Sequence, residues 1–419
     1  MPTGRKPPSL SSGYFSRILH EKSCASRLLL FHKNTHESIL TTQLTLKNRD
    51  AERMFMEDDN GTRCPALTVA VFAKENCIFN AADIVDAAWF RGDMVPFWRI
   101  FLAGVACEHQ AAEDGSEADS DALQALSEDV RYNHDLITAE ETEMWLMSHG
   151  LTLDDLNEYS SRLYWSRQAI APPQAEAIHY PDAAADIREL FLKDLFFGGA
   201  FEQLASLLSW RAACQAEPDP PDLAGRLEAE RSQFVQRTGS APGQLAGWLR
   251  QLGRDEQWFE NLAAQEAVYR WNCDRLRTPE NRARVLATLR LPLTRFEIEM
   301  LDLETADAAH EACLCLDFDG LSMQDLAAQE HYRVEKLAVF LEDFPEALKQ
   351  RLLSAKKGLV LDMTTSDDRF QVCRIIDKKE PTLTDNKVLA RVDAELVAGH
   401  FGNLVSNHIT WLLQPDSSA

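Results

Sequence analysis

The chain is short of basic residues for its size. Its 419 residues include 43 Lys and Arg against 66 Asp and Glu, which gives a formal net charge of −23. Affinity for a nucleic-acid backbone or an anionic membrane surface depends on Lys and Arg side chains that face phosphates. The composition therefore argues against nucleic acids and membrane surfaces as partners, although it says nothing about the fold.

Long apolar runs and the common phosphate-binding and nucleophile motifs are also absent. No run approaches the roughly 18 apolar residues of a membrane-spanning helix, and the LLLF run at residues 28–31 is too short for a secretory signal. The sequence contains no P-loop, no G-x-G-x-x-G and no G-x-S-x-G. NTPase, dinucleotide-binding and hydrolase interpretations therefore lack the geometry that they need.

The cysteines suggest neither a disulfide framework nor a metal site. There are nine, an odd number without regular spacing, which suits free thiols in a reducing compartment, so we expect a cytoplasmic protein. His310 and Cys313 share a helical face near Cys315, but finger-like sites need a second ligand pair. His32 and His36 lack the Glu of a zincin motif. We therefore predict no metal and no cofactor.

The N-terminal residues differ from the rest of the chain. The first 53 residues hold nine Lys and Arg against four Asp and Glu and are rich in Ser and Thr. We expect residues 1–56 to form a basic, poorly ordered extension. A transit peptide has a similar composition but fewer acids. A natural start at Met54 or Met56 is a further alternative.

The middle of the chain contains a weak internal repeat. Residues 89–107 align with residues 196–214, and the WLMSHG segment that begins at Trp145 aligns with the WLRQLG segment that begins at Trp248. The Gly that ends each Trp-Leu segment suits the residue after a helix. Thr138 and Glu141 predict a capping box ahead of Trp145.

This pattern predicts two related helical units, at residues 57–175 and 176–290. In each, an apolar helix is followed by an acidic connection, a Trp-Leu helix and a third amphipathic helix. The alternative is that two unrelated helical bundles place Trp and Gly alike.

The character of the sequence changes after residue 291. Residues 291–382 predict an α+β domain, and residues 383–419 hold a long amphipathic helix from Asp385 to about Trp411, whose apolar side needs the helical region as cover. The expected order is a strand, two helices, a strand, a helix and two strands, at residues 293–303, 305–316, 322–329, 334–340, 344–355 and the hairpin 358–379.

These segments resemble known proteins. The hairpin at 358–379, GLVLDMTTSDDRFQVCRIIDKK, resembles the closing hairpin of a parvulin-type prolyl isomerase, and the element order before it is similar too. The upstream WL…GL-x-x-x-DL phrasing resembles the helical portion of SurA-like proteins. The resemblance implies a mainly α protein with a C-terminal parvulin-like α+β domain, in which helices before and after that domain pack together.

The resemblance also implies catalytic positions that this sequence does not fill. The His of the first parvulin strand falls at Glu297 or Glu299, and the His of the last strand falls at Gln371, between Phe370 and Val372. The Gly-rich segment before the last helix is missing. We therefore expect a degenerate domain whose isomerase activity is absent or weak.

Three functions follow as hypotheses. The first is a non-catalytic SurA/parvulin-like chaperone or peptide-recognition protein that holds an extended client, with peptide maturation or secretion as its setting. The second is an active prolyl isomerase with an altered site, and the third is an accessory subunit of a peptide-modifying enzyme. Aromatic side chains typical of a core or of a peptide groove are the candidate binding residues: Trp89, Phe97, Trp98, Phe201, Phe340, Phe344 and Phe370.

Overall fold

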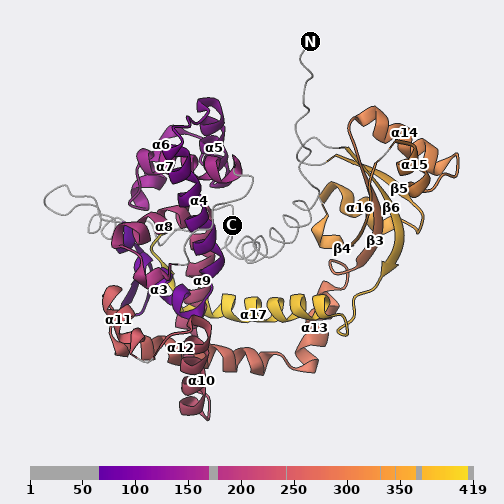
Figure 1. Ribbon diagram of the computed structural model, residues 1–419. Coiled ribbons are helices and arrows are strands. Elements are labelled where there is room, and N and C mark those ends of the chain that lie inside the picture. The colour runs from indigo at the N-terminus through magenta and orange to yellow at the C-terminus, as the bar shows by residue number, and fades with distance from the viewer. Residues whose placement is uncertain are drawn as a thin grey trace. The chain divides into compact units, whose positions relative to one another are not determined.

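The computed structural model describes residues 66–168, 178–241, 243–330, 332–344, 346–364 and 370–413 (Figure 1). The predicted N-terminal extension and the pair His32 and His36 lie outside these residues. The described chain forms two compact units. The first comprises the described residues up to Arg275 together with residues 398–413, and the second is Leu276–Val397.

The first unit is mainly helical. It opens with a short hairpin of β1 (Ala70–Lys74) and β2 (Cys77–Asn80), and β1 also pairs with β7 (Thr410–Trp411). The helices follow in the order α3 (Ala81–Arg91), α4 (Val95–Glu113), α5 (Ser120–Asn133), α6 (Ala139–Ser148), α7 (Leu153–Gln168), α8 (Ala185–Phe197), α9 (Ala200–Ala213), α10 (Leu223–Thr238), α11 (Gln244–Gln251) and α12 (Glu256–Leu276).

Each predicted apolar helix of the repeat is in fact two helices. Residues 89–107 are divided between α3 and α4, where Gly92 has a φ of 83°. Residues 196–214 are divided between α8 and α9, where Gly199 has a φ of 68°. A left-handed backbone is available to Gly without steric cost, so both breaks occur at that residue type.

The two Trp-Leu helices end alike. The capping box of Thr138 and Glu141 is confirmed at the start of α6. After α6, Leu151 N donates to Leu146 O at 2.7 Å, and after α11, Arg254 N donates to Leu249 O at the same distance. Gly150 and Gly253, with φ of 67° and 70°, allow these closures. The local likeness agrees with duplication, which itself stays a prediction.

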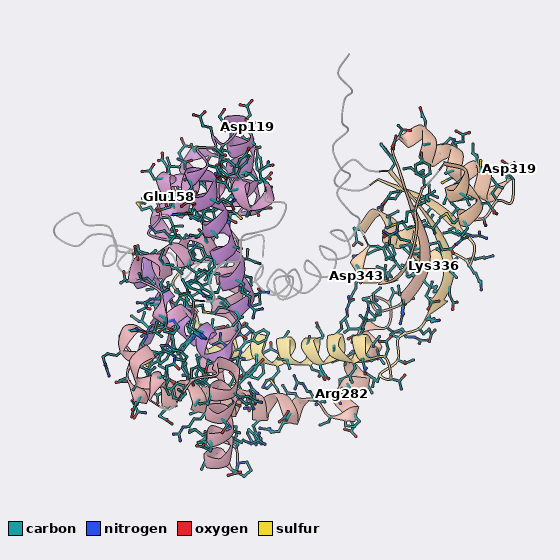
Figure 2. All side chains as sticks on the ribbon, in the orientation of Figure 1. Asp119, Glu158, Arg282, Asp319, Lys336 and Asp343 are labelled. Carbon is teal, nitrogen blue, oxygen red and sulfur yellow. The ribbon has the colours of Figure 1, made fainter. Side chains whose placement is uncertain are left out.

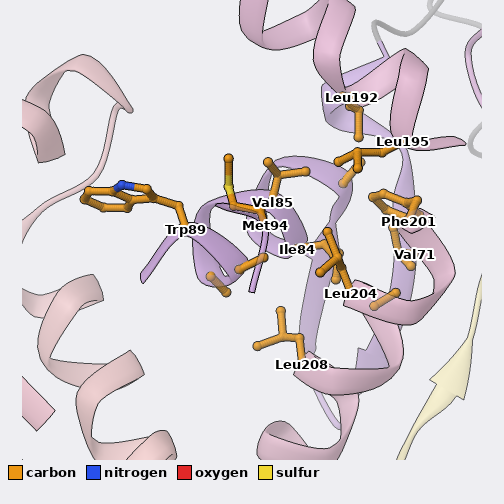
Figure 3. Close-up of a cluster of buried hydrophobic side chains, with 14 of the residues drawn as sticks. Val71, Ile84, Val85, Trp89, Met94, Leu192, Leu195, Phe201, Leu204 and Leu208 are labelled. Atoms are coloured by element: carbon orange, nitrogen blue, oxygen red, sulfur yellow. The ribbon is translucent and has the colours of Figure 1, made fainter. Parts of the chain in front are cut away.

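One large hydrophobic core takes side chains from every helix from α3 to α12. Figure 3 shows part of it, where Ile84 and Val85 of α3 meet Phe201, Leu204 and Leu208 of α9. The side chains of Trp145 and Trp248 both belong to this core, at 8% and 2% exposure. Because the two predicted helical units share a single core, they pack as one body here.

The second unit is the predicted α+β domain. After α13 (Pro279–Leu289) come β3 (Arg295–Leu303), α14 (Ala306–Asp317), α15 (Met323–Glu330), β4 (Val334–Phe340), α16 (Glu346–Ser354), β5 (Val360–Thr364) and β6 (Phe370–Lys379). This is the order that the parvulin resemblance implied, and Thr305 caps α14 as its position predicts. The antiparallel sheet has the strand order β4-β3-β6-β5.

Both faces of this sheet are covered by helices. On one face Leu301, Leu303 and Val372 pack with α14 and α15. On the other, Phe296, Ile298 and other apolar residues pack with α16. Alternate residues of β3 therefore enter two separate cores, as the two-residue period of a strand requires.

The last helix, α17 (Asn386–His408), is shorter than predicted and is divided between the two units. Trp411 lies in β7, not in the helix. In the α+β unit, Val388 and Val392 pack with Leu293 and Phe340. Residues 276–290, predicted to end the helical region, also belong to that unit.

The second half of α17 contributes to the helical unit. Phe401 is fully buried, with ring centroids 6.0 Å from Trp210 and 4.9 Å from Tyr269. Val405 and Ile409 enter the main core. None of the described helices is both long enough and apolar enough to cross a membrane.

Candidate peptide-binding site

Gln371, which the parvulin resemblance assigned to the position of the second His, is buried on β6. Its side chain is 6% exposed, and its Nε2 donates to Oδ1 of Asp302 at 2.6 Å. The two residues are directly opposite each other in the β3–β6 ladder. An amide cannot take up or release a proton near neutral pH, so Gln371 itself offers a hydrogen bond but no titrating group.

Glu297 and Glu299 do not join Gln371. On β3 they alternate with Ile298, Met300 and Asp302, and Gln371 is on the Asp302 side. Glu299 is buried on the opposite face, where it accepts from Gln324 at 2.9 Å and pairs with Lys336 at 3.2 Å. Lys336 is labelled on β4 in Figure 2. The strand period therefore places Glu297 and Glu299 on one face of the sheet and Gln371 on the other.

The neighbouring thiol is not a substitute for the missing groups. Cys373 follows Gln371 by two residues on the same face and is fully buried. Burial raises its pKa to about 12, because the thiolate would lose its hydration. A thiol in this state is a poor nucleophile at neutral pH.

The aromatic residues predicted to bind peptide mostly belong to cores. Phe344 packs edge-on against Phe296, with ring centroids 6.0 Å apart, and Phe340 lies under the guanidinium of Arg391. Large aromatic rings release the most water when buried, which favours core positions over an open groove. The buried members of the set are Trp89, Trp98, Phe201, Phe340 and Phe344, while Phe97 and Phe370 are partly buried against the same cores.

An open cleft does exist on the helical unit, between α6 and the start of α7. It has a volume of about 570 Å³ and an apolar floor that includes Leu146 and Leu151. Met144, Met147 and Leu153 stand around this floor with 58%, 53% and 54% of their surface exposed. Three large apolar side chains at one opening are unusual on a water-facing surface and are typical of a binding site.

The sequence places these methionines through the helix period. In α6, Trp145 and Leu146 point into the core, so Met144 and Met147, three residues apart, share the outer face. Methionine is flexible and polarisable, which lets one surface fit several partner shapes. The predicted binding residues are all aromatic and do not include these methionines. The signal for Met144 and Met147 was their position outside the core-facing stripe of α6.

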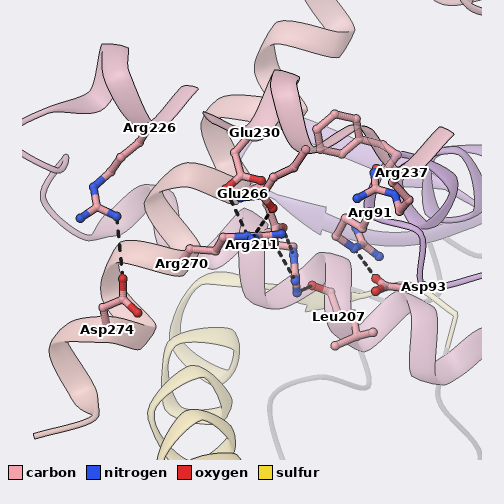
Figure 4. Close-up of polar contacts among 12 residues, drawn as sticks. Arg91, Asp93, Leu207, Arg211, Arg226, Glu230, Arg237, Glu266, Arg270 and Asp274 are labelled. Carbon is pink, nitrogen blue, oxygen red and sulfur yellow. Dashed lines mark hydrogen bonds and ion pairs between the residues drawn. The ribbon is translucent and has the colours of Figure 1, made fainter. Parts of the chain in front are cut away.

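A buried ion-pair network lies elsewhere in the helical unit (Figure 4). Arg211 Nε donates to Glu266 Oε2 at 2.6 Å, and Arg270 bridges Glu266 and Glu230 at 3.1 Å each. Burial opposes ionisation of Glu266, but the charge of Arg211 prevails and holds its pKa at about 2. Since its charges are mutually satisfied, the network fixes α9, α10 and α12 together and is not a candidate site.

The described residues contain no group of three or more His, Cys, Asp or Glu side chains arranged to hold a metal ion. His310, Cys313 and Cys315 all lie on α14, but His310 is exposed. They form no metal-binding cluster in the part of the chain that the structure describes.

The molecule thus combines a helical unit with an α+β unit of parvulin-like element order. No protein-family model matches the sequence, and no curated protein is similar to it. Several solved structures show some likeness. The peptidylprolyl isomerase PrsA of Bacillus anthracis is 13% identical and covers 49% of this chain and 94% of its own, with a TM-score of 0.29.

PrsA of Bacillus cereus is 10% identical and covers 52% of this chain and 85% of its own, with a TM-score of 0.33. A structure from the Campylobacter jejuni proteins PEB4 and Cj1289, described as SurA-like chaperones, is 10% identical and covers 51% and 86%, with a TM-score of 0.18. Because these TM-scores are below 0.5, we rest the proposed function on this chain's own residues.

Proposed function

We propose that the protein is a non-catalytic, chaperone-like peptide-binding protein. The observation that carries this proposal is the open cleft with Met144, Met147 and Leu153 around an apolar floor. A client segment that buried its own apolar side chains there would remove this surface from water, at roughly 25 cal/mol per Å². The α+β unit supports the non-catalytic part, because the side chain of Gln371, which is hydrogen-bonded to Asp302, is an amide that cannot transfer a proton.

Peptide binding can be tested with one double variant and one matched control. We expect fluorescence anisotropy with a labelled, unfolded apolar peptide to give saturable binding to the full chain. Met144→Glu with Met147→Glu should weaken it about tenfold or more, since a few central residues dominate most interfaces. Val235→Glu, at a 46% exposed position on α10, should leave it unchanged.

Circular dichroism melts show whether both variants fold as stably as the parent chain. We expect that they do, because all three positions are exposed and should tolerate Glu. Unchanged affinity in the double variant, with a melt like that of the parent chain, would rule out this cleft as the binding site. Failure of the full chain to bind any unfolded peptide would overturn the proposed function itself.

A further inference from the structure

The rim of the cleft indicates which peptides it takes. We propose that its occupant is a client segment that carries Lys or Arg beside its apolar residues, an inference that rests on the proposed function. The lining includes three acidic residues, Glu140, Glu143 and Asp154, and no basic one. Each of the three carboxylates is exposed. An apolar floor with only negative charge at its edge complements a cationic, amphipathic partner.

The acidic side chains at this place are of two kinds. Glu141 accepts from the backbone N–H groups of Ile137 and Thr138, which lowers its pKa, and Asp155 bonds Thr152 and Lys193. These two stabilise the helix starts. The side-chain carboxylates of Glu140, Glu143 and Asp154 make no hydrogen bond or ion pair with another described residue. They are therefore available to a partner, and their mutual repulsion would fall when a cation arrives.

The surrounding helices extend the negative field. Residues 120–168 carry ten Asp and Glu against three Arg. Arg131 is engaged with Thr142 and the Ile137 carbonyl, and Arg162 forms a two-point pair with Asp194. Asp119 at the start of α5 and Glu158 on α7 are labelled in Figure 2 at this end of the helical unit. Like-charged clefts concentrate ligands of opposite sign and speed their association.

The test uses three fluorescein-labelled helical peptides with the same leucine face. One has lysines beside the leucines, the second has glutamines there and the third has glutamates. We expect the full chain to bind the lysine peptide about tenfold more tightly than the glutamine peptide, and the glutamate peptide least. Raising salt from 0.1 to 1 M should erase most of the difference, because the Debye length falls from ~10 to ~3 Å.

A rim variant separates charge from shape. Glu140→Gln, Glu143→Gln and Asp154→Asn together should remove the lysine preference while the glutamine peptide binds within about twofold of its original affinity. The matched control is Glu117→Gln with Asp219→Asn and Glu256→Gln, three exposed acidic positions of the helical unit outside residues 120–168 and outside the cleft lining, which should keep the lysine preference.

The outcomes distinguish the two claims. Equal affinity for lysine and glutamine peptides, both lost in the methionine double variant, would overturn the charge preference and leave peptide binding intact. Binding of none of the three peptides would sink both. Concentration-dependent dimerisation in sedimentation, abolished by Met144→Glu, would mean that a second copy of the chain occupies the cleft and would overturn the inference.

Discussion

Gln371 and Asp302 face each other across the two central strands of the α+β sheet, 2.6 Å apart between Nε2 and Oδ1. The pair joins a carboxylate to an amide whose protonation does not change with pH in the physiological range. It links the ends of β3 and β6, and the amide of Gln371 cannot respond to a prolyl bond by proton transfer as an imidazole could. Four expectations follow from this pair and from the contacts described above.

The first concerns prolyl isomerisation. We expect X-Pro peptides to convert at close to the uncatalysed rate, over tens to hundreds of seconds, in the presence of the full chain. Gln371→Ala should leave that rate unchanged, because no catalysis depends on the amide. NMR exchange or a protease-coupled assay gives the rate. Fast turnover that disappears in Gln371→Ala would show an active site with an altered polar pair.

The second concerns the two tryptophans of the repeat. Trp145→Ala and Trp248→Ala should each lower the free energy of unfolding by about 3–5 kcal/mol, since each removes a buried indole from the shared core. Trp248→Phe should cost less, about 1 kcal/mol, through loss of the 2.8 Å bond from Nε1 to Asp182. Urea denaturation measures the free energy of unfolding of all three variants. If replacing either Trp by Ala left that free energy nearly unchanged, the two side chains would not have equivalent roles in the core.

The third concerns pH. Burial raises the pKa of both Asp86 and Asp194 to about 6, although Arg254 and Arg162 respectively oppose the shift. A carboxyl that binds its proton more tightly when folded stabilises the fold most below its unfolded pKa of 3.8. That stabilisation disappears as pH rises through 6.

The variants Asp86→Asn and Asp194→Asn should therefore flatten the decline of unfolding free energy between about pH 4 and 6, by up to about 3 kcal/mol each. Asp129→Asn, at an exposed carboxyl, serves as the control. Glu266 behaves in the opposite way, because its folded pKa is about 2. Its ionised form stabilises the fold above the unfolded pKa of 4.5, and that contribution is lost as the pH falls from 4.5 towards 2. A pH profile identical in wild type and both variants would contradict the burial effect.

The fourth concerns the end of α17. Phe401→Ala should destabilise the helical unit by about 3–5 kcal/mol, because its ring is fully buried against Trp210 and Tyr269. Leu412→Ala, at a 41% exposed position, should have little effect. A chain that ends at Pro381 should likewise melt earlier than the full chain in its helical part. An unchanged melt would mean that the contacts of this helix contribute nothing to stability.

The α+β elements were predictable because each has a local signal. Thr305 supplies a cap, β-branched and aromatic residues alternate in β3 and β6, and Asp385 precedes a long amphipathic pattern. The predicted range 334–340 and the observed β4 coincide. The end of α17 was harder, since Trp411 fits a helical stripe but forms a strand with Phe72, a partner far away in the sequence.

The candidate site was less accessible to sequence reasoning than the fold. Whether Glu299 and Gln371 share a sheet face depends on strand alternation and register, which a resemblance in element order does not give. The cleft depends on which side of α6 meets the core, and Trp145 decides that through packing. The aromatic residues predicted for binding are packed in the cores. The candidate site is therefore formed by the exposed methionines.

The short pairing of Trp411 with Phe72 has a consequence for synthesis on the ribosome. Strand β1 is among the first described elements to emerge, while β7 and the second half of α17 emerge after the entire α+β unit. The helical unit therefore cannot complete its core until the last elements arrive, whereas Leu276–Val397 can begin to fold earlier. Long-range closure of this kind slows folding, because a large loop must be ordered before its contacts form.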